Sequence, residues 1–170
     1  MPQLARKTVT VLFSDVTGFT ALGERLDPES VHHVMGRFFT EMAGVVERHG
    51  GIVEKFIGDE VMALFGLPVL HEDDALRAAR AALEMRTVLD ALNEELTLRW
   101  DIRLNVHTGV NTGEVVAGVL GTGDAVTYGD PVNVAQRLQA AASPARSSSA
   151  PRLPSCCTAE RALPHWRRCA

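Results

Sequence analysis

Short β-branched or apolar runs alternate with long amphipathic segments, and this alternation constrains the fold more than any other feature. The short runs have the length and composition of strands. Five strands are expected, at residues 8–13, 52–57, 61–65, about 99–107 and about 114–120. The second and third flank the tight connection Gly58-Asp59-Glu60, so they should form a hairpin with Asp59 near its tip. Gly121 and Gly123 predict a turn after the last strand.

Three helices are expected, two between the strands and one after the last of them. Asp27-Pro28-Glu29 is typical of a helix start, with a capping acid, a proline at the first position and an acid in the first turn, and Gly50-Gly51 should end this helix. A second helix should cover about 71–96 and a third 131–142, with Asp130 as a plausible cap. The order β, α, ββ, α, ββ, α predicts an α/β sandwich of one sheet with helices packed on it.

Composition limits the classes of function. The chain has 170 residues, of which 46% are hydrophobic and 22% charged, as in a single soluble domain. Residues 1–143 carry 12 basic and 20 acidic residues, a net charge of −8 without a basic stripe, which argues against nucleic-acid binding. No apolar run reaches the roughly 20 residues of a membrane span, and no signal segment opens the chain. We therefore expect a cytoplasmic protein with no membrane span.

The last segment, 144–170, differs from the body at 1–143. Pro, Ser, Ala and Arg make up 18 of its 27 residues, so a disordered or loosely attached tail is expected. All three cysteines, Cys156, Cys157 and Cys169, lie in this tail without a set of zinc-ligand partners. Redox chemistry is therefore not expected.

Two acids are the strongest candidates for chemistry. Asp15 ends the first strand and Asp59 lies at the hairpin tip, so the two carboxylates converge if the hairpin lies beside that strand. One or two carboxylates completed by substrate phosphates are the usual Mg²⁺ site, and free N–H groups of Thr17-Gly18-Phe19-Thr20 could bind phosphate. The plainer alternative is that both acids are turn formers.

Three more polar residues could act with these acids. Lys55 lies four residues before Asp59, although it could equally be a solvated edge lysine. Asn133 and Arg137 are four apart and share a helix face, where they could hold a sugar and neutralise phosphate charge. A turn asparagine and a surface arginine are the alternative. His107, at a strand end, is either a base or a satisfied structural histidine.

Together these segments resemble one family. The chain is similar to the class III nucleotidyl cyclases, the adenylate and guanylate cyclase catalytic domain of the bacterial soluble type, over about residues 6–143. The resemblance rests on four segments in the family's order: 11–20 (VLFSDVTGFT), 51–63 (GIVEKFIGDEVMA), 112–118 (TGEVVAG) and 129–138 (GDPVNVAQRL). It implies an α+β fold, a ferredoxin-like α/β sandwich of the nucleotide cyclase type that lacks its last strands.

The resemblance also implies site roles. Asp15 and Asp59 would hold two Mg²⁺ or Mn²⁺ ions per site, helped by the carbonyl of Val16. Lys55 would contact the purine, Asn133 would orient the ribose and Arg137 would stabilise charge at the α-phosphate. The segment from Thr17 to Thr20 (Thr17, Gly18, Phe19, Thr20) and Gly58 would line the nucleotide. The implied reaction converts ATP to cyclic AMP and pyrophosphate at sites shared between two subunits, in intracellular signal transduction.

Two departures from the family pattern qualify this expectation. Val126 stands where the family has a second base-reading residue, and Thr127 could serve after a one-residue shift. Lys55 still favours ATP, because guanylate cyclases commonly carry Glu there. The tail lacks the family's phosphate-binding lysine, and its composition looks like a frameshifted reading. The alternative function is therefore a catalytically impaired module that dimerises with, or regulates, a larger cyclase-containing chain. A polymerase palm, which shares paired carboxylates, does not fit the acidic body.

Overall fold

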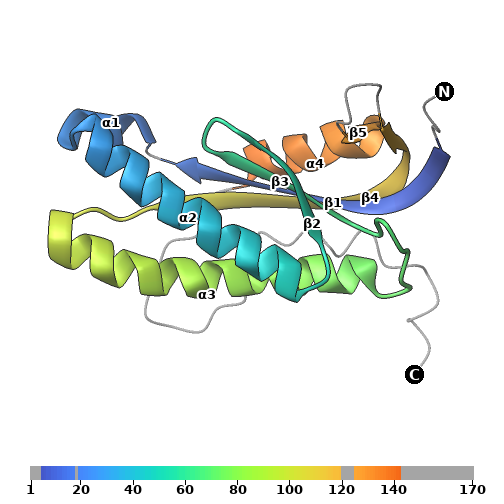
Figure 1. Cartoon of the computed structure of the whole chain (residues 1–170), viewed down its shortest axis with the longest axis horizontal. Helices are drawn as coiled ribbons and strands as arrows, with labels where there is room; N and C mark the ends of the chain where they lie inside the picture. The colour runs from blue at the N-terminus through green and yellow to red at the C-terminus, as the bar shows by residue number, and fades with distance from the viewer. Residues whose placement is uncertain (1–4, 18, 120–124, 143–170) are drawn as a thin grey trace.

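A five-stranded antiparallel sheet organises the molecule. The computed structural model describes residues 5–17, 19–119 and 125–142 (Figure 1). The strands follow the order β2-β3-β1-β4-β5. Their bounds are β1 Ala5–Thr17, β2 Ile52–Ile57, β3 Glu60–Phe65, β4 Asn105–Val119 and β5 Ala125–Tyr128; the helices are α1 Phe19–Arg25, α2 Pro28–Arg48, α3 Asp74–Trp100 and α4 Asp130–Ala141. The cyclase-type α/β sandwich expected from the sequence is confirmed.

The central strand β1 is buried on both faces and separates two cores. Its side chains alternate, as the pleat requires. Val11 and Phe13 face the smaller cluster, which contains Ala135 of α4. Leu12 and Val16 face the larger cluster, built mainly from α2, α3 and the adjoining strands. The sheet therefore lies between a layer of α2 and α3 and a layer formed by α4.

Local signals determine the start and end of α2. The Asp27 carboxylate accepts a hydrogen bond from the Ser30 backbone N–H at 2.9 Å, so Asp27 is the cap that the sequence predicts. Beyond the helix, Gly50 adopts φ 76°, a conformation that favours glycine. The apolar face of α2, which includes Val34, Phe38, Met42 and Val46, is buried.

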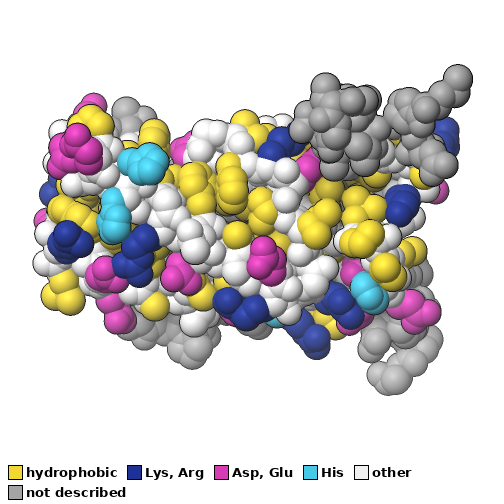
Figure 2. All heavy atoms as spheres, in the orientation of Figure 1, with side chains coloured by type: hydrophobic (Ala, Val, Ile, Leu, Met, Phe, Trp, Pro, Cys, Tyr) yellow, Lys and Arg dark blue, Asp and Glu magenta, His cyan; other side chains and the backbone are white. Residues whose placement is uncertain are grey.

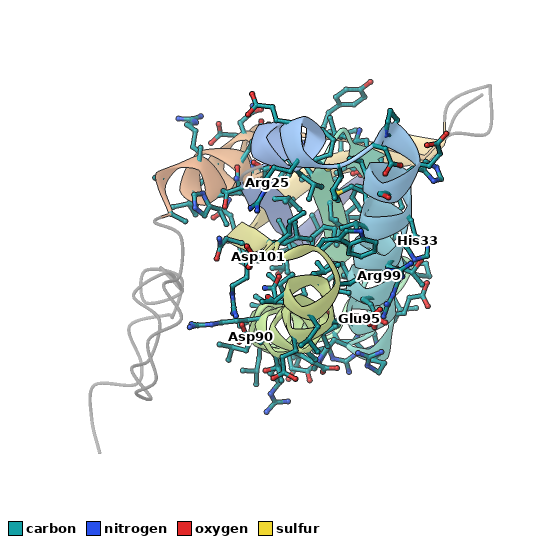
Figure 3. All side chains as sticks on the ribbon, turned by 90° about the vertical axis from the view of Figure 1, so that its left-hand side faces the viewer. Arg25, His33, Asp90, Glu95, Arg99 and Asp101 are labelled. Atoms are coloured by element: carbon teal, nitrogen blue, oxygen red, sulfur yellow. The ribbon has the colours of Figure 1, made fainter. Side chains whose placement is uncertain are left out.

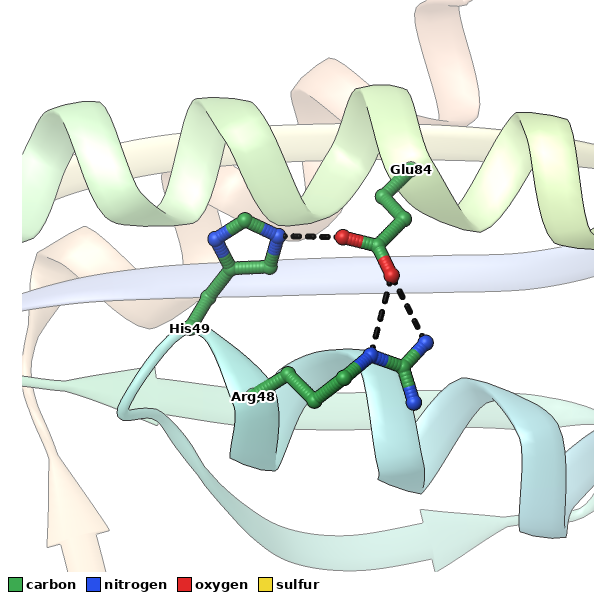
Figure 4. A network of polar contacts seen from close by, with 3 residues as sticks. All are labelled: Arg48, His49 and Glu84. Carbon is green, nitrogen blue, oxygen red and sulfur yellow. Dashed lines mark hydrogen bonds and ion pairs between the residues drawn. The ribbon is translucent and has the colours of Figure 1, made fainter.

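Ion pairs join the exposed edges of α2 and α3. Glu84 of α3 accepts two hydrogen bonds from the Arg48 guanidinium, at 3.0 and 2.7 Å, and lies 2.7 Å from His49 Nε2 (Figure 4). Nearer the other end, Arg37 pairs with Glu95. Figure 3 shows Glu95 on the flank of α3 that faces α2. These contacts align two helices whose shared core carries most of the packing.

A second contact joins the end of α1 to the end of α3. Arg25 of α1 pairs with Asp101, just beyond α3, at 3.6 Å (Figure 3). Asp101 itself adopts the left-handed conformation, φ 54°, and ends the helix.

No helix in the described part of the chain has the length and apolarity needed to cross a membrane.

The structure corrects several expected boundaries. The strands expected at 99–107 and 114–120 are wrong, because α3 continues to Trp100 and one strand, β4, spans Asn105–Val119. The loop at 14–20 leads into a helix as expected, but that helix is the separate short α1, and α3 begins at Asp74. The residue that caps α4 is Gly129, so Asp130 lies in the first turn. Gly121, Gly123 and the tail at 144–170 lie outside the described residues.

Candidate active site

The sheet brings Asp15 and Asp59 to the same place. Asp15 lies near the end of β1, opposite Glu60 of β3 on one side and His107 of β4 on the other. Asp59 occupies the turn between β2 and β3, and its carbonyl accepts a hydrogen bond from the Val16 N–H at 3.4 Å. The hairpin therefore lies beside β1, which is the arrangement on which the sequence hypothesis depended.

Acidic side chains gather at this point, and the charge of His107 offsets only part of their mutual repulsion. Burial raises the pKa of Asp15, and the nearby charge of Asp59 raises it further. Burial likewise raises the pKa of Glu60, with Asp15 and Asp59 adding to the effect. Carboxylates whose repulsion is uncompensated are suited to a hard divalent cation, which prefers oxygen ligands. The donor chemistry of Asp15 and Asp59 thus fits Mg²⁺ or Mn²⁺.

The site does not form a complete protein cage. Within residues 5–17, 19–119 and 125–142, no group of three or more His, Cys, Asp or Glu side chains is arranged to hold a metal ion. Mg²⁺ characteristically takes only one or two carboxylates and completes its shell with water and substrate phosphates. An arrangement of two aspartates is what such a substrate-completed site requires.

Two neighbours of Asp15 modify its electrostatics. The Gln139 amide, on α4, donates to Asp15 Oδ2 at 3.3 Å. His107 lies next to Asp15 across the strand pair, and both neighbours lower the pKa of that carboxyl against the stronger effect of burial. His107 Nε2 is buried, with no hydrogen-bond partner within the residues that the structure describes. The sequence analysis did not find Gln139. It lies two residues after Arg137 and therefore on a different face of α4, the face that packs on the sheet.

The nucleotide-binding candidates fall into two groups. Thr17 donates its hydroxyl proton to the Asn105 carbonyl at 3.3 Å, and α1 begins at Phe19, so the expected loop does lead into a helix. Gly18 and the Thr20 side chain lie outside the described residues. Gly58 adopts φ 65° with open space around it, as the tight turn before Asp59 requires.

Lys55 and Thr127 come from strands at opposite edges of the sheet. Lys55 lies on β2, and its side chain is half exposed. Thr127 on β5 is buried, with 8% of its surface accessible. Both lower the pKa of the Glu54 carboxyl against the larger, opposite effect of burial, so both lie near this carboxyl. The side chain of Val126 lies outside the described residues.

Asn133 and Arg137 project away from the sheet. Both are exposed on α4, and Arg137 is 3.7 Å from Asp130 on the same helix. Within the described residues, neither forms a hydrogen bond or ion pair with the two aspartates of its own chain. The expected grouping of these two side chains on one helix face is therefore present, but it is directed to the outside of this chain.

Glycines bring α4 very close to the sheet. A Cβ atom on Gly109 would lie 2.3 Å from the Ala135 carbonyl oxygen and 2.4 Å from the Gln139 nitrogen. At Gly113, it would lie 2.5 Å from Pro131 Cγ. These contacts fix the position of α4, and with it the outward direction of Asn133 and Arg137.

The fold and the paired acids define a class of protein, the nucleotide cyclase catalytic domains. A comparison with protein families gives the same result: residues 1–154 match the model of the adenylate and guanylate cyclase catalytic domain. The chain belongs to this family. The match extends past residue 143, where the motif resemblance ends.

Known relatives include enzymes named for either nucleotide. The chain is 34% identical over 137 residues to adenylate cyclase 1 of Rhizobium meliloti, covering 79% of this chain and 21% of that protein. The structure of the adenylyl cyclase CyaB from P. aeruginosa superposes with a TM-score of 0.80 at 32% identity, covering 84% of this chain and 76% of that one. The guanylyl cyclase Cya2 gives 0.76 at 38% identity, covering 80% and 71%. The chain thus spans about a fifth of the length of the first of these relatives.

Proposed function

We propose that this domain converts ATP to 3′,5′-cyclic AMP and pyrophosphate at sites formed between two copies of the chain. The observation that carries the proposal is the geometry of one protomer. Asp15 and Asp59 converge, while Asn133 and Arg137 are exposed on α4 without contact to them. A second copy can therefore supply the amide and guanidinium that the first copy's acids lack.

The chain's residues would divide the work of the reaction between them. The ribose 3′-oxygen attacks the α-phosphorus, the bond to the bridging pyrophosphate oxygen breaks, and the hydroxyl proton passes to solvent water. Asp15 and Asp59, with the Val16 carbonyl, would hold two Mg²⁺ or Mn²⁺ ions, which lower the pKa of the hydroxyl and neutralise phosphate charge. Asn133 orients the ribose, and Arg137 stabilises charge on the α-phosphate. The protein thus supplies position and charge rather than a covalent nucleophile.

An exposed apolar surface on β2 supports self-association. Ile52, Phe56 and Ile57 expose 39%, 47% and 46% of their surfaces. Figure 2 shows hydrophobic side chains gathered on this face of the molecule, where β2 crosses in front of the sheet. Contiguous apolar surface of this kind is characteristic of an interface. It lies on the same hairpin as Lys55 and Asp59, so an interface here would contribute directly to the site.

Lys55 supports ATP as the substrate. Its ammonium can donate to the ring nitrogen N1 of adenine, and the half-exposed side chain is accessible to a ligand. The remaining nucleotide contacts, from Thr17, Phe19, Thr20 and Gly58, stay predictions. An ATP-dependent signalling reaction would take place in the cytoplasm.

Turnover by the purified chain tests the proposal. Formation of cyclic AMP from ATP with Mn²⁺, and of cyclic GMP from GTP, is measured beside the mass of the oligomer. We expect cyclic AMP from the dimer and its loss in Asp15→Asn and Asp59→Asn. Asp90→Asn is the matched control, because that acid lies on α3 and its ion-pair partner in the described part of the chain is Arg103. A pure dimer without turnover that binds an intact cyclase chain tightly would instead identify the regulatory module.

A further inference from the structure

Glu54 is a buried acid that the proposed reaction does not use. It lies on β2 at the irregularity in pairing between Val53 and Lys55, where a β-bulge changes the direction of the side chain. Only 3% of the side chain is exposed. Both carboxylate oxygens are buried, and neither has a hydrogen-bond partner among the described residues. Burial of a charge without full pairing is costly, so an apolar side chain would be expected here on stability grounds alone.

The two groups beside this carboxyl are the candidates for reading the purine. Lys55 Nζ lies 4.0 Å from Glu54 Oε1. The side chain and backbone of Thr127 approach from β5. Burial raises the pKa of Glu54, while Lys55 and Thr127 act in the opposite direction because they favour the charged form. The Glu54 carboxyl therefore lies beside both residues that would contact the base, Lys55 on its own strand and Thr127 on β5.

We propose that Glu54 is a positioning residue for purine recognition, which fixes the Lys55 ammonium and makes the Thr127 hydroxyl an acceptor toward the base. This inference rests on the proposed function. Glu54 is too buried to touch the nucleotide, so it acts through its two neighbours. With a nucleotide bound, the Thr127 hydroxyl would turn its proton toward the unpartnered Glu54 carboxylate, and its oxygen would then offer only lone pairs to the ligand. The ammonium keeps donors free for the ligand.

This arrangement distinguishes the two purines. Adenine carries a donor at its 6-amino group and an acceptor at N1, which match the Thr127 acceptor and the Lys55 donor. Guanine reverses both, with an acceptor at O6 and a donor at N1. If Glu54 holds both neighbours in place, guanine meets two mismatched contacts. Without Glu54, the Thr127 hydroxyl can rotate and donate, and the lysine can move, so either purine can be accommodated.

Nucleotide binding and thermal unfolding of Glu54→Leu and Glu54→Gln test the inference. The probes are non-hydrolysable ATP and GTP analogues with the purified dimer and Mn²⁺, and Glu114→Gln, an exposed acid on β4, is the control. We expect the wild type to prefer the ATP analogue. In Glu54→Leu the ratio of the two affinities should fall about tenfold, the scale of one buried polar contact. The melting temperature should stay the same or rise, and Glu54→Gln should give a smaller loss of preference.

A double-mutant comparison separates positioning from a structural role. Thr127→Val should lower the preference in the wild type but have little further effect in Glu54→Leu, because the two residues act as one unit. An unchanged ratio, a preference for the GTP analogue in the wild type, or an equal loss of both analogues with a lowered melting temperature overturns the inference. Cyclic AMP formation with an unaltered ratio in Glu54→Leu rejects this inference alone. A wild type that neither binds nor converts a nucleotide rejects the proposed function as well.

Discussion

Replacement of Gly109 by alanine should displace the helix that carries Asn133 and Arg137. The added methyl group would meet the Ala135 oxygen at 2.3 Å, the Gln139 nitrogen at 2.4 Å and the Gln139 Cα at 2.9 Å. All three are backbone atoms of α4, so no side chain can rotate away. To restore an ordinary separation of about 3.5 Å, the helix must move by about 1 Å. Overpacking of this kind costs about 3 kcal/mol, the upper part of the usual range, because the backbone itself must shift.

Urea unfolding and cyclase turnover measure the two consequences separately. Gly109→Ala should lower the free energy of unfolding by about 3 kcal/mol. Turnover of the remaining folded protein should fall about 100-fold, since Asn133 and Arg137 would be misplaced by about 1 Å. Gly36→Ala is the matched control: nothing lies within 4 Å of its added methyl group in α2. That variant should gain about 0.5–1 kcal/mol. Wild-type stability and turnover in Gly109→Ala would refute the reasoning.

Two further predictions concern the acids. Gln139→Leu removes the donor to Asp15 Oδ2 and should weaken Mn²⁺ binding about 10-fold or more, as measured by calorimetry. Gln136→Leu, at an exposed position of the same helix, should bind Mn²⁺ as the wild type does, and equal affinities in both variants would contradict the role given to Gln139. The pKa values of Asp15 and Glu60 are raised in the folded protein above their ordinary values of 3.8 and 4.5. At pH values between the ordinary and the raised pKa values, the folded, metal-free protein therefore binds more protons than the unfolded chain. The contribution of these two acids to stability should therefore increase as the pH falls from 7 through the raised values, and Glu60→Gln should show a smaller increase in melting temperature. If the difference in melting temperature between the wild type and Glu60→Gln does not change with pH, protonation of Glu60 does not stabilise the folded state.

Local signals made α2 and β1 predictable from the sequence. Asp27 and Pro28 define the helix start through groups only three residues apart, and the Thr8–Phe13 run is apolar enough to be a central strand. The convergence of Asp15 with Asp59 was also predictable, because it follows from one hairpin lying beside one strand. In each case the decisive interaction lies within a short segment or between elements that are adjacent in the sheet.

Features that depend on tertiary packing were not predictable in the same way. The sequence predicts two strands, at about 99–107 and 114–120, where the structure has the single strand β4, and Gly109 and Gly113 lie in the stretch between the two predicted strands. These glycines are required by the close approach of α4, which no local pattern reveals. The inward direction of Glu54 depends on the bulge in β2, since regular alternation does not specify it. Gln139 becomes a partner of Asp15 only when α4 is packed on the sheet.

The proposed sharing of each site between two copies of the chain is tested most directly with mixed dimers. Asp59→Ala should lack the metal-binding acid and Arg137→Ala the charge-stabilising guanidinium, so each variant alone should be inactive. In an equal mixture that exchanges subunits, half of the dimers are mixed, and each mixed dimer has one intact site and one doubly altered site. We predict that the mixture recovers about a quarter of wild-type cyclic AMP formation. A mixture as inactive as its components, with mixed dimers confirmed by mass, would contradict the account.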